Sequence, residues 1–132
     1  MKIREEIIKN YIDGYNSFNT EMMARDLDEQ LLFENISNGN VTDSLLGKQE
    51  FINQAEQAKS IFSERHQKIT SIEHFENHSE INIDYTAKLS KDLSPELNIG
   101  DSISLKGKSI FEFSPENKII VFNSFNNYIN KG

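Results

Sequence analysis

The last third of the chain, Ser102 to Ile129, restricts the possible folds more than any other stretch. Two runs rich in Ile, Val and Phe flank the tetrapeptide Ser-Pro-Glu-Asn at residues 114–117. Ser-Pro pairs favour turns and proline is excluded from central strands, so this stretch predicts an antiparallel hairpin. The second arm, Ile119 to Phe122, is apolar on both faces, and such a strand is usually covered on both sides. We therefore expect one face to meet the core of the domain and the other to meet a partner chain.

Helical patterns come before most of the strands. Apolar residues recur at helical spacing over residues 2–18 and again over 47–64, and Asn19 followed by Thr20 predicts the start of a short helix that runs to Leu27. The predicted strands are residues 31–36, 66–76, 81–89 and the two hairpin arms, and the predicted loops are residues 37–43, 76–80 and 90–101. Helices followed by a meander of strands predict an α+β fold, in which a bent sheet wraps over the first helix and leaves a pocket between them.

Composition excludes several classes of partner. The 132 residues carry 14 Lys and Arg against 21 Asp and Glu, which gives a net charge of −7. No basic cluster is present to bind a phosphate backbone, so we expect no nucleic-acid partner. No apolar run is long enough to span a bilayer, so we expect no membrane partner. The absence of cysteine removes disulfides and thiolate metal sites and favours a cytoplasmic location.

Three phrases of the sequence resemble a known superfamily. They are IIKNYIDGYNSFNTEMMARDLDEQLLFEN from Ile7, GKQEFI from Gly47 and SIFEFSPENKIIVFNSF from Ser109. Nearly the whole chain resembles the nuclear transport factor 2-like proteins, in particular their SnoaL-like and ketosteroid-isomerase-like members. The resemblance implies a single SnoaL-like domain over residues 1–132 and a cone-shaped α+β barrel, with three N-terminal helices packed on a strongly curved, mainly antiparallel sheet. Because that scaffold hosts isomerases, cyclases, dehydratases, hydrolases and binders, the resemblance does not assign a reaction.

Ketosteroid isomerases give the sharpest comparison within that superfamily. They use an Asp base together with an oxyanion hole made by a Tyr and a protonated Asp. The resemblance aligns Tyr11 with that Tyr, Asn35 with the base and Ser109 with the second Asp. Asn cannot act as a base, and Ser donates a weaker hydrogen bond than a carboxylic acid does. The resemblance therefore implies the pocket without the ketosteroid-isomerase activity.

The expected pocket is apolar and carries a ring of neutral polar groups, which suits an uncharged or weakly polar ligand. Its residues share one face of the first helix or one parity along each strand. The predicted ligand-binding residues are Tyr11, Tyr15, Phe33, Asn35, Ser109, Phe111, Phe122, Ser124 and Asn126. An alternative interpretation also fits, in which the two tyrosines are core rings and the polar side chains of the strands bond to one another.

Two other functions stay open on the sequence. An enzyme of the isomerase, cyclase or dehydratase type could use Glu34 or Asp84 as its base, if either carboxylate were buried in the pocket. A non-catalytic dimeric module is the other possibility, because Val121, Asn123 and Phe125 on the opposite face of the last strand predict a homodimer through the outer sheet face. The three histidines do not converge, so we expect no metal site, and no motif indicates a cofactor.

Overall fold

The computed structural model describes residues 2–126, which form a helical layer and one sheet. The helices are α1 (Lys2–Asn16), α2 (Thr20–Ala24) and α3 (Lys48–Ala58), and a 3-10 turn, η1 (Lys59–Ile61), follows α3. The strands are β1 (Leu27–Ser37), β2 (Asn40–Leu46), β3 (Phe62–His74), β4 (His78–Leu89), β5 (Ser102–Phe113) and β6 (Ile119–Asn126). The described helices all precede β3, as the sequence predicted.

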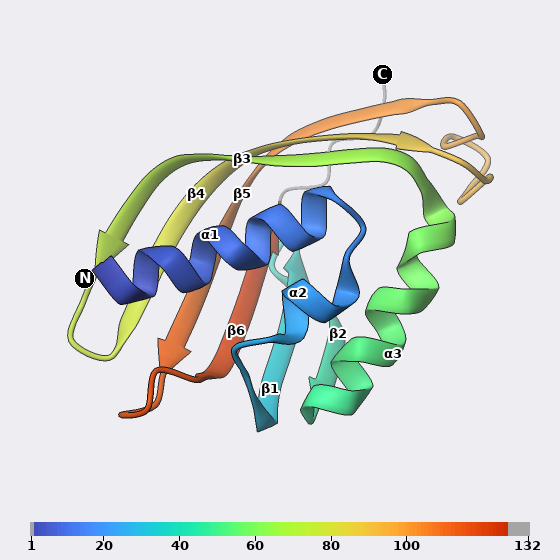
Figure 1. The fold of residues 1–132 in the computed structure, drawn as a ribbon. Helices are drawn as coiled ribbons and strands as arrows, with labels where there is room; N and C mark the ends of the chain where they lie inside the picture. The colour runs from blue at the N-terminus through green and yellow to red at the C-terminus, as the bar shows by residue number, and fades with distance from the viewer. Residues whose placement is uncertain (1, 127–132) are drawn as a thin grey trace.

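The six described strands form one curved sheet in the order β2-β1-β6-β5-β4-β3. Neighbouring strands are antiparallel except β1 and β6, which run parallel. Figure 1 shows α1 lying across the concave side of the sheet, with α3 at the β2 end. The predicted cone-shaped α+β barrel, with three helices on a strongly curved and mainly antiparallel sheet, is confirmed. None of the described helices combines the length and apolar character that a membrane crossing needs.

The predicted C-terminal hairpin is confirmed as far as residue 126, and its last three residues, 127–129, lie outside the described residues. β5 and β6 pair on either side of the turn at residues 114–117. Asn117 adopts a φ of 63° there and donates its backbone N–H to the carbonyl of Ser114 at 2.9 Å. Because β6 lies between β1 and β5, both of its edges are hydrogen-bonded within the sheet.

A bulge at the start of β6 changes which side chains face the core. The pairing with β5 shifts its register between Glu112 and Phe113. Ile119 and Phe122 are both almost fully buried, whereas Ile120 is half-buried. Simple alternation along β6 would put Ile120 on the face of Phe122, but the bulge adds a residue and resets the alternation of the strand, so Ile120 does not share the buried face.

Strand β2 replaces part of the predicted loop at residues 37–43. Asn38 and Gly39 connect it to β1 with φ values of 51° and 82°, the positive values that a two-residue hairpin turn requires. The loop prediction was wrong because Asn-Gly between two apolar runs is itself a hairpin signal. The third helix also ends earlier than predicted, at Ala58, and β3 already begins at Phe62.

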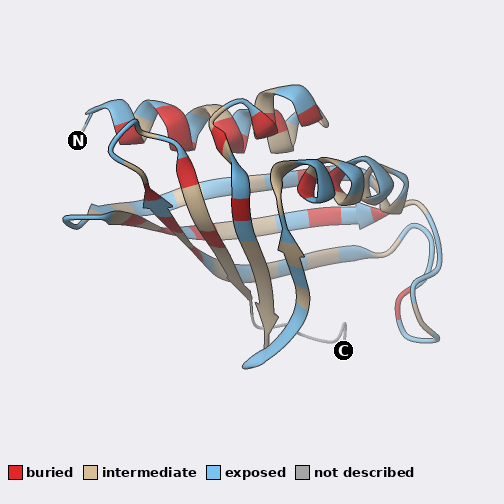
Figure 2. Ribbon diagram, turned by 90° about the horizontal axis from the view of Figure 1, so that it is seen from below, coloured by how far each residue is buried: buried red, intermediate tan, exposed pale blue. Residues whose placement is uncertain are grey.

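The core lies between α1 and the concave face of the sheet, where Figure 2 shows buried residues concentrated. Gly14 of α1 is buried and permits a close approach of α2, because a Cβ at Gly14 would lie 2.8 Å from both Met22 Cβ and the Met23 backbone nitrogen. Asn19 caps α2 as predicted, accepting the backbone N–H of Met22 at 3.0 Å. The two helices are thus held together by close backbone packing and by the hydrogen bond that Asn10 Nδ2 donates to the Met22 carbonyl at 2.9 Å.

Candidate functional site

A cavity of about 380 Å³, called the main cavity below, lies between the helices and the concave face of the sheet. Eight of the nine predicted ligand-binding residues line it, namely Tyr11, Tyr15, Phe33, Asn35, Ser109, Phe122, Ser124 and Asn126. Phe111 does not line it, because its ring is fully buried and stacks behind Phe122 with the ring centroids 4.6 Å apart. The structure therefore brings the predicted set together around one cavity, with Phe111 supporting the wall.

One row of polar side chains crosses the sheet wall of the main cavity. Asp43 on β2, Asn35 on β1, Ser124 on β6 and Ser109 on β5 are successive cross-strand partners, and all four line the cavity. Neighbouring strands lie about 4.8 Å apart, so the row spans about 14 Å. Neither serine side chain has a hydrogen-bond partner among the described residues. Both hydroxyls are therefore available to a ligand.

The two asparagines close one end of the main cavity. Asn126 Nδ2 donates to Asn35 Oδ1 at 3.2 Å, and Asn35 Nδ2 donates to Thr42 Oγ1 at 2.8 Å. Ser37 donates its hydroxyl to Asn126 Oδ1 at 2.6 Å. For these two amides the structure agrees with the alternative interpretation, since their side chains bond to one another and tie β1 to β2 and β6. Part of their hydrogen-bonding capacity is consequently used within the protein.

Three tyrosine hydroxyls belong to the cavity wall. Those of Tyr15 and Tyr85 share a hydrogen bond with their oxygens 2.8 Å apart, whereas the Tyr11 hydroxyl has no hydrogen-bond partner among the described residues. Burial raises the pKa of all three phenols, so each stays a neutral O–H donor at physiological pH. The Tyr11 ring packs edge-on against Phe122 with the centroids 5.0 Å apart. Tyr11 therefore offers a free hydroxyl on an immobilised ring.

Neither carboxylate considered as a base reaches the main cavity. Glu34 lies on the opposite face of β1 from Asn35 and accepts a hydrogen bond from β2 at 3.4 Å. Asp84 pairs with Lys106 Nζ at 2.8 Å, also away from the cavity. Successive strand residues point to opposite faces, so the cavity-facing position of Asn35 excludes its neighbour. The interpretation that Glu34 or Asp84 is a base in the pocket is therefore wrong, because neither carboxylate lines the main cavity.

Asp43 is a carboxylate in the cavity wall that the sequence did not reveal. It is half-buried, makes no ion pair with a described residue, and has Thr42 Oγ1 at 3.5 Å from its Oδ2. The signal that could have located it is the Asn38-Gly39 turn, since that turn makes the following residues a strand and sets Asp43 opposite Asn35. Within residues 2–126, no group of His, Asp and Glu side chains is arranged to hold a metal ion.

A smaller cavity of about 120 Å³ adjoins the main cavity and shares Tyr11, Tyr15, Phe33 and Gln54 with it. Arg65 of β3 lines this small cavity and is only 6% exposed. The sequence pattern did not single out Arg65, because a charged residue at the edge of a predicted strand is usually solvated. Its burial depends on residues of α1 and α2 that are distant in the sequence.

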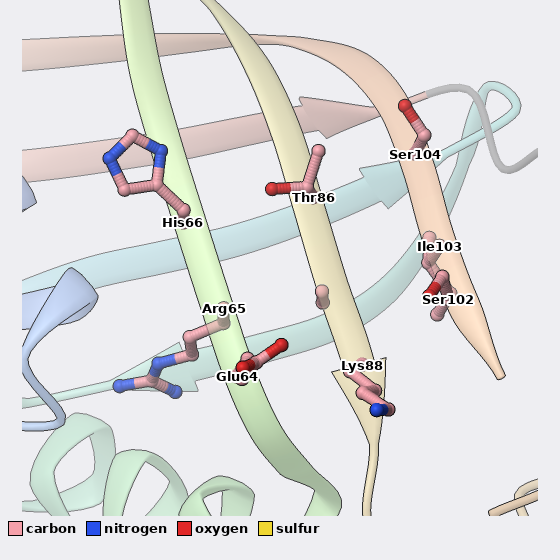
Figure 3. Close-up of a pocket in the computed structure, with 9 residues that line it drawn as sticks. Glu64, Arg65, His66, Thr86, Lys88, Ser102, Ile103 and Ser104 are labelled. Carbon is pink, nitrogen blue, oxygen red and sulfur yellow. The ribbon is translucent and has the colours of Figure 1, made fainter. Parts of the chain in front are cut away.

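A further hollow of about 550 Å³ lies where β3, β4 and β5 run side by side, and Figure 3 shows the side chains around it. Two cross-strand rows form it, Glu64 with Lys88 and Ser102, and His66 with Thr86 and Ser104. These six residues are all exposed, and the lining contains no Phe, Tyr or Trp. Ligand sites normally enclose the ligand with apolar walls, so the main cavity is the better candidate.

The outer face of the sheet carries a small apolar surface. Leu32 pairs with Val121 on one side and with Leu46 on the other, and these three residues define the outer apolar surface. Leu32 is 36% exposed, Leu46 is 72% exposed and Val121 is half-buried. Asn123 lies on the same face of β6 and is half-buried. Phe125, expected on that face, instead contributes to the lining of the main cavity near the end of β6. The predicted dimer surface is therefore smaller than expected.

Neither protein-family models nor curated protein sequences match the chain, whereas solved structures do. An NTF2-like protein of unknown function from Burkholderia pseudomallei matches with a TM-score of 0.80 and 10% identity, over 96% of this chain and 92% of that chain. A proposed SnoaL-like polyketide cyclase from Shewanella denitrificans matches with a TM-score of 0.79 and 11% identity, over 96% of this chain and 92% of that chain. A hypothetical protein with a ketosteroid isomerase-like fold from Catenulispora acidiphila, solved in complex with trimethylamine, also matches. Its TM-score is 0.74 and its identity 9%, over 92% of this chain and 85% of that chain. The chain has the nuclear transport factor 2-like fold.

This fold is the one that the sequence resemblance implied. At such low identities the similarity extends to the fold alone, and NTF2-like scaffolds carry many unrelated activities. The activity of this NTF2-like chain must therefore be argued from the chemistry of its own cavity wall.

Proposed function

We propose that this chain is a single SnoaL-like domain that binds a small, mostly apolar molecule, neutral or weakly polar, in the main cavity. The observation that carries the proposal is the combination of ring surfaces from Phe33 and Phe122 with the unpartnered hydroxyls of Tyr11, Ser109 and Ser124. Binding sites for small molecules typically combine apolar walls with a few placed polar groups in this way.

Native mass spectrometry of freshly purified protein, followed by calorimetry with any ligand it identifies, tests this proposal. Tyr11→Phe should weaken binding by about 1 kcal/mol, the usual net contribution of one hydrogen bond, without changing the unfolding curve. Ser109→Ala should act in the same direction, and Ser104→Ala, on the exposed face of the same strand, is its matched control. Equal affinities for wild type and Tyr11→Phe would show that Tyr11 is only a core ring.

Asp43 supports a second candidate, an enzyme of the isomerase, cyclase or dehydratase type. Asp43 is the only carboxylate among the described residues that line the main cavity, and a general base must lie within hydrogen-bond reach of the proton it removes. For an enzyme, Asp43→Asn should lower turnover by about 10²–10⁴-fold and leave ligand affinity nearly unchanged. Equal turnover in Asp43→Asn would remove Asp43 from the chemistry.

Ketosteroid isomerisation is not the activity that we propose. Asn35 cannot remove a proton next to a carbonyl, and Tyr11 with Ser109 is a weaker oxyanion pair than Tyr with a carboxylic acid. We expect no useful turnover of a β,γ-unsaturated ketosteroid by the wild type, and a gain in the Asn35→Asp, Ser109→Asp double variant. Robust turnover by the wild type would contradict this expectation and would point to Asp43 as the base.

We also propose a homodimer through the outer apolar surface. Leu32, Leu46 and Val121 form a contiguous apolar area across three strands, which a two-fold contact would bury. Val121→Glu should shift the protein toward monomer in analytical ultracentrifugation, with Thr86→Glu on the exposed part of the sheet as the control. Sedimentation of the wild type as a monomer at micromolar concentration would show the proposal to be wrong.

A further inference from the structure

Arg65 carries a buried positive charge that the described part of the chain does not neutralise. Its Nε donates to the backbone carbonyl of Tyr15 at 2.8 Å, and its Nη2 lies 3.9 Å from Met23 Sδ. The guanidinium carbon lies over the rings of Tyr15 and Phe18, 3.9 and 4.3 Å from their centroids. No carboxylate oxygen within residues 2–126 pairs with this guanidinium, which lies close enough to the Tyr15 hydroxyl to offset, through a hydrogen bond, part of the rise that burial causes in the pKa of that phenol.

This arrangement is unusual because burying a cation without a counter-charge is unfavourable. The chain has 21 Asp and Glu against 14 Lys and Arg, so carboxylates are plentiful, yet none of those described is placed at Arg65. The two rings and the carbonyl fix the position of the guanidinium. They place no carboxylate against the guanidinium, whose other contacts are the Tyr15 hydroxyl and a thioether, which is a weak acceptor. The result is a positioned guanidinium that pairs with no carboxylate of the described residues.

The small cavity gives an anion a route to this guanidinium. Figure 3 shows Arg65 extending from β3 toward the helices, which is the side of this cavity. Gln54 of α3 lines both cavities, and its side chain has no hydrogen-bond partner among the described residues. Phe33 and Phe51 form apolar walls, and such surroundings strengthen a charge–charge contact compared with water. An incoming oxyanion would therefore find both a fixed cation and a free amide.

We propose that the small cavity binds the oxyanion group of a ligand, in the simplest case a carboxylate, while the apolar body of the same ligand lies in the main cavity. The inference rests on the proposed ligand site and changes one part of it: the body of the ligand in the main cavity stays apolar, but the group in the small cavity is charged rather than weakly polar. The planar guanidinium presents N–H groups in a fork that matches the two oxygens of a carboxylate. The walls shared by Tyr11, Tyr15, Phe33 and Gln54 place the two cavities next to each other.

The test compares 2-naphthoate with 2-naphthamide, which have nearly the same shape and differ in charge. In calorimetry the wild type should bind the acid at least about tenfold more tightly than the amide, as expected for a charge-assisted hydrogen bond. Arg65→Gln should remove this preference, and Arg65→Lys should keep part of it. Lys106→Gln, which removes one positive charge from an exposed position, is the matched control and should keep the full preference.

The outcomes separate the two proposals. Equal affinity of the wild type for acid and amide would overturn the oxyanion site and leave ligand binding in the main cavity standing. A preference that survives in Arg65→Gln would also overturn the site. If neither compound binds, both proposals fail for this class of ligand. Should Arg65→Gln fail to fold, a crystal structure of the wild type with naphthoate decides, and a carboxylate placed away from the guanidinium would overturn the inference.

Discussion

The two buried arginines have different surroundings: Arg4 belongs to the first turn of α1, and Arg65 contacts the last turn of the same helix. Arg4 is 7% exposed and Arg65 is 6% exposed, so burial does not distinguish them. Arg4 donates from Nη1 and Nη2 to the backbone carbonyls of Phe75, Glu76 and His78, at 2.6 to 3.2 Å. Arg65 donates to a single carbonyl and otherwise meets rings and a sulfur atom.

The partners that a buried arginine hydrogen-bonds therefore indicate its role better than its degree of burial does. Arg4 ties the first turn of α1 to the hairpin between β3 and β4, and both of its Nη groups are used in doing so. Arg65 lines a cavity and pairs with no carboxylate of the described residues. A structural arginine is satisfied by the fold, whereas an arginine that serves a ligand is satisfied only when the ligand is bound.

The largest effect should come from Arg4→Met. The change leaves three partly buried carbonyls without their charged donor, so we expect the free energy of unfolding to fall by about 3 kcal/mol. Urea denaturation followed by circular dichroism measures it. A loss no greater than that of Arg65→Met would remove the distinction between the two arginines.

Gly14→Ala should have the next largest effect, at the end of α1 that Arg65 contacts. A Cβ there would lie 2.8 Å from the backbone nitrogen of Met23, so α2 must move away. We expect a net loss of about 1–2 kcal/mol, after the better helix propensity of alanine is counted. Thermal unfolding measures it. Unchanged stability of Gly14→Ala would indicate that α2 is not held by close packing.

Arg65→Met should have a smaller effect on stability. Replacing an uncompensated buried cation by an apolar side chain of similar length is often neutral, so we expect a change below about 1 kcal/mol. The comparison with Arg4→Met in the same urea experiment is direct, because the substitution is identical. A loss near 3 kcal/mol would make Arg65 a structural residue like Arg4.

The smallest expected effect is that of pH on the preference for naphthoate over naphthamide. Arginine stays protonated, and burial raises the pKa of Tyr11, Tyr15 and Tyr85, so the preference should be constant from about pH 6 to about pH 9. Among the described residues, no histidine lines either inner cavity. A fall in the preference across the usual range of histidine titration would therefore contradict the assignment to Arg65.

The sequence predicted those parts of the molecule that depend on local pattern. The alternation along β1, β5 and β6 placed Phe33, Asn35, Ser109 and Ser124 correctly on one side, because each strand follows its period of two where no bulge intervenes. The bulge near Ile119 broke that rule, since it arises from pairing between strands rather than from the sequence of β6 alone.

The parts that could not be predicted depend on contacts between distant residues. Asp43 entered the cavity wall through the pairing of β2 with β1, after an Asn-Gly turn that was interpreted as a loop. Arg65 is buried by contacts with Tyr15 and Met23, 50 and 42 residues away in the sequence. Whether a cation has a counter-charge is a property of the assembled structure, and no periodicity in the chain encodes it.

The central position of β6 has a consequence for how the chain folds. β1 and β2 reach the rest of the sheet only through β6, which is the last described strand in the chain. Until β6 is synthesised, the β1–β2 hairpin has no neighbour in the sheet, and the polar row across the cavity wall is split into two halves. Pairing over such a sequence separation is slow, and the unpaired edges of β1 and β5 stay open to other chains in the meantime. Chains truncated before Ile119 should therefore aggregate rather than form a smaller, functional cavity.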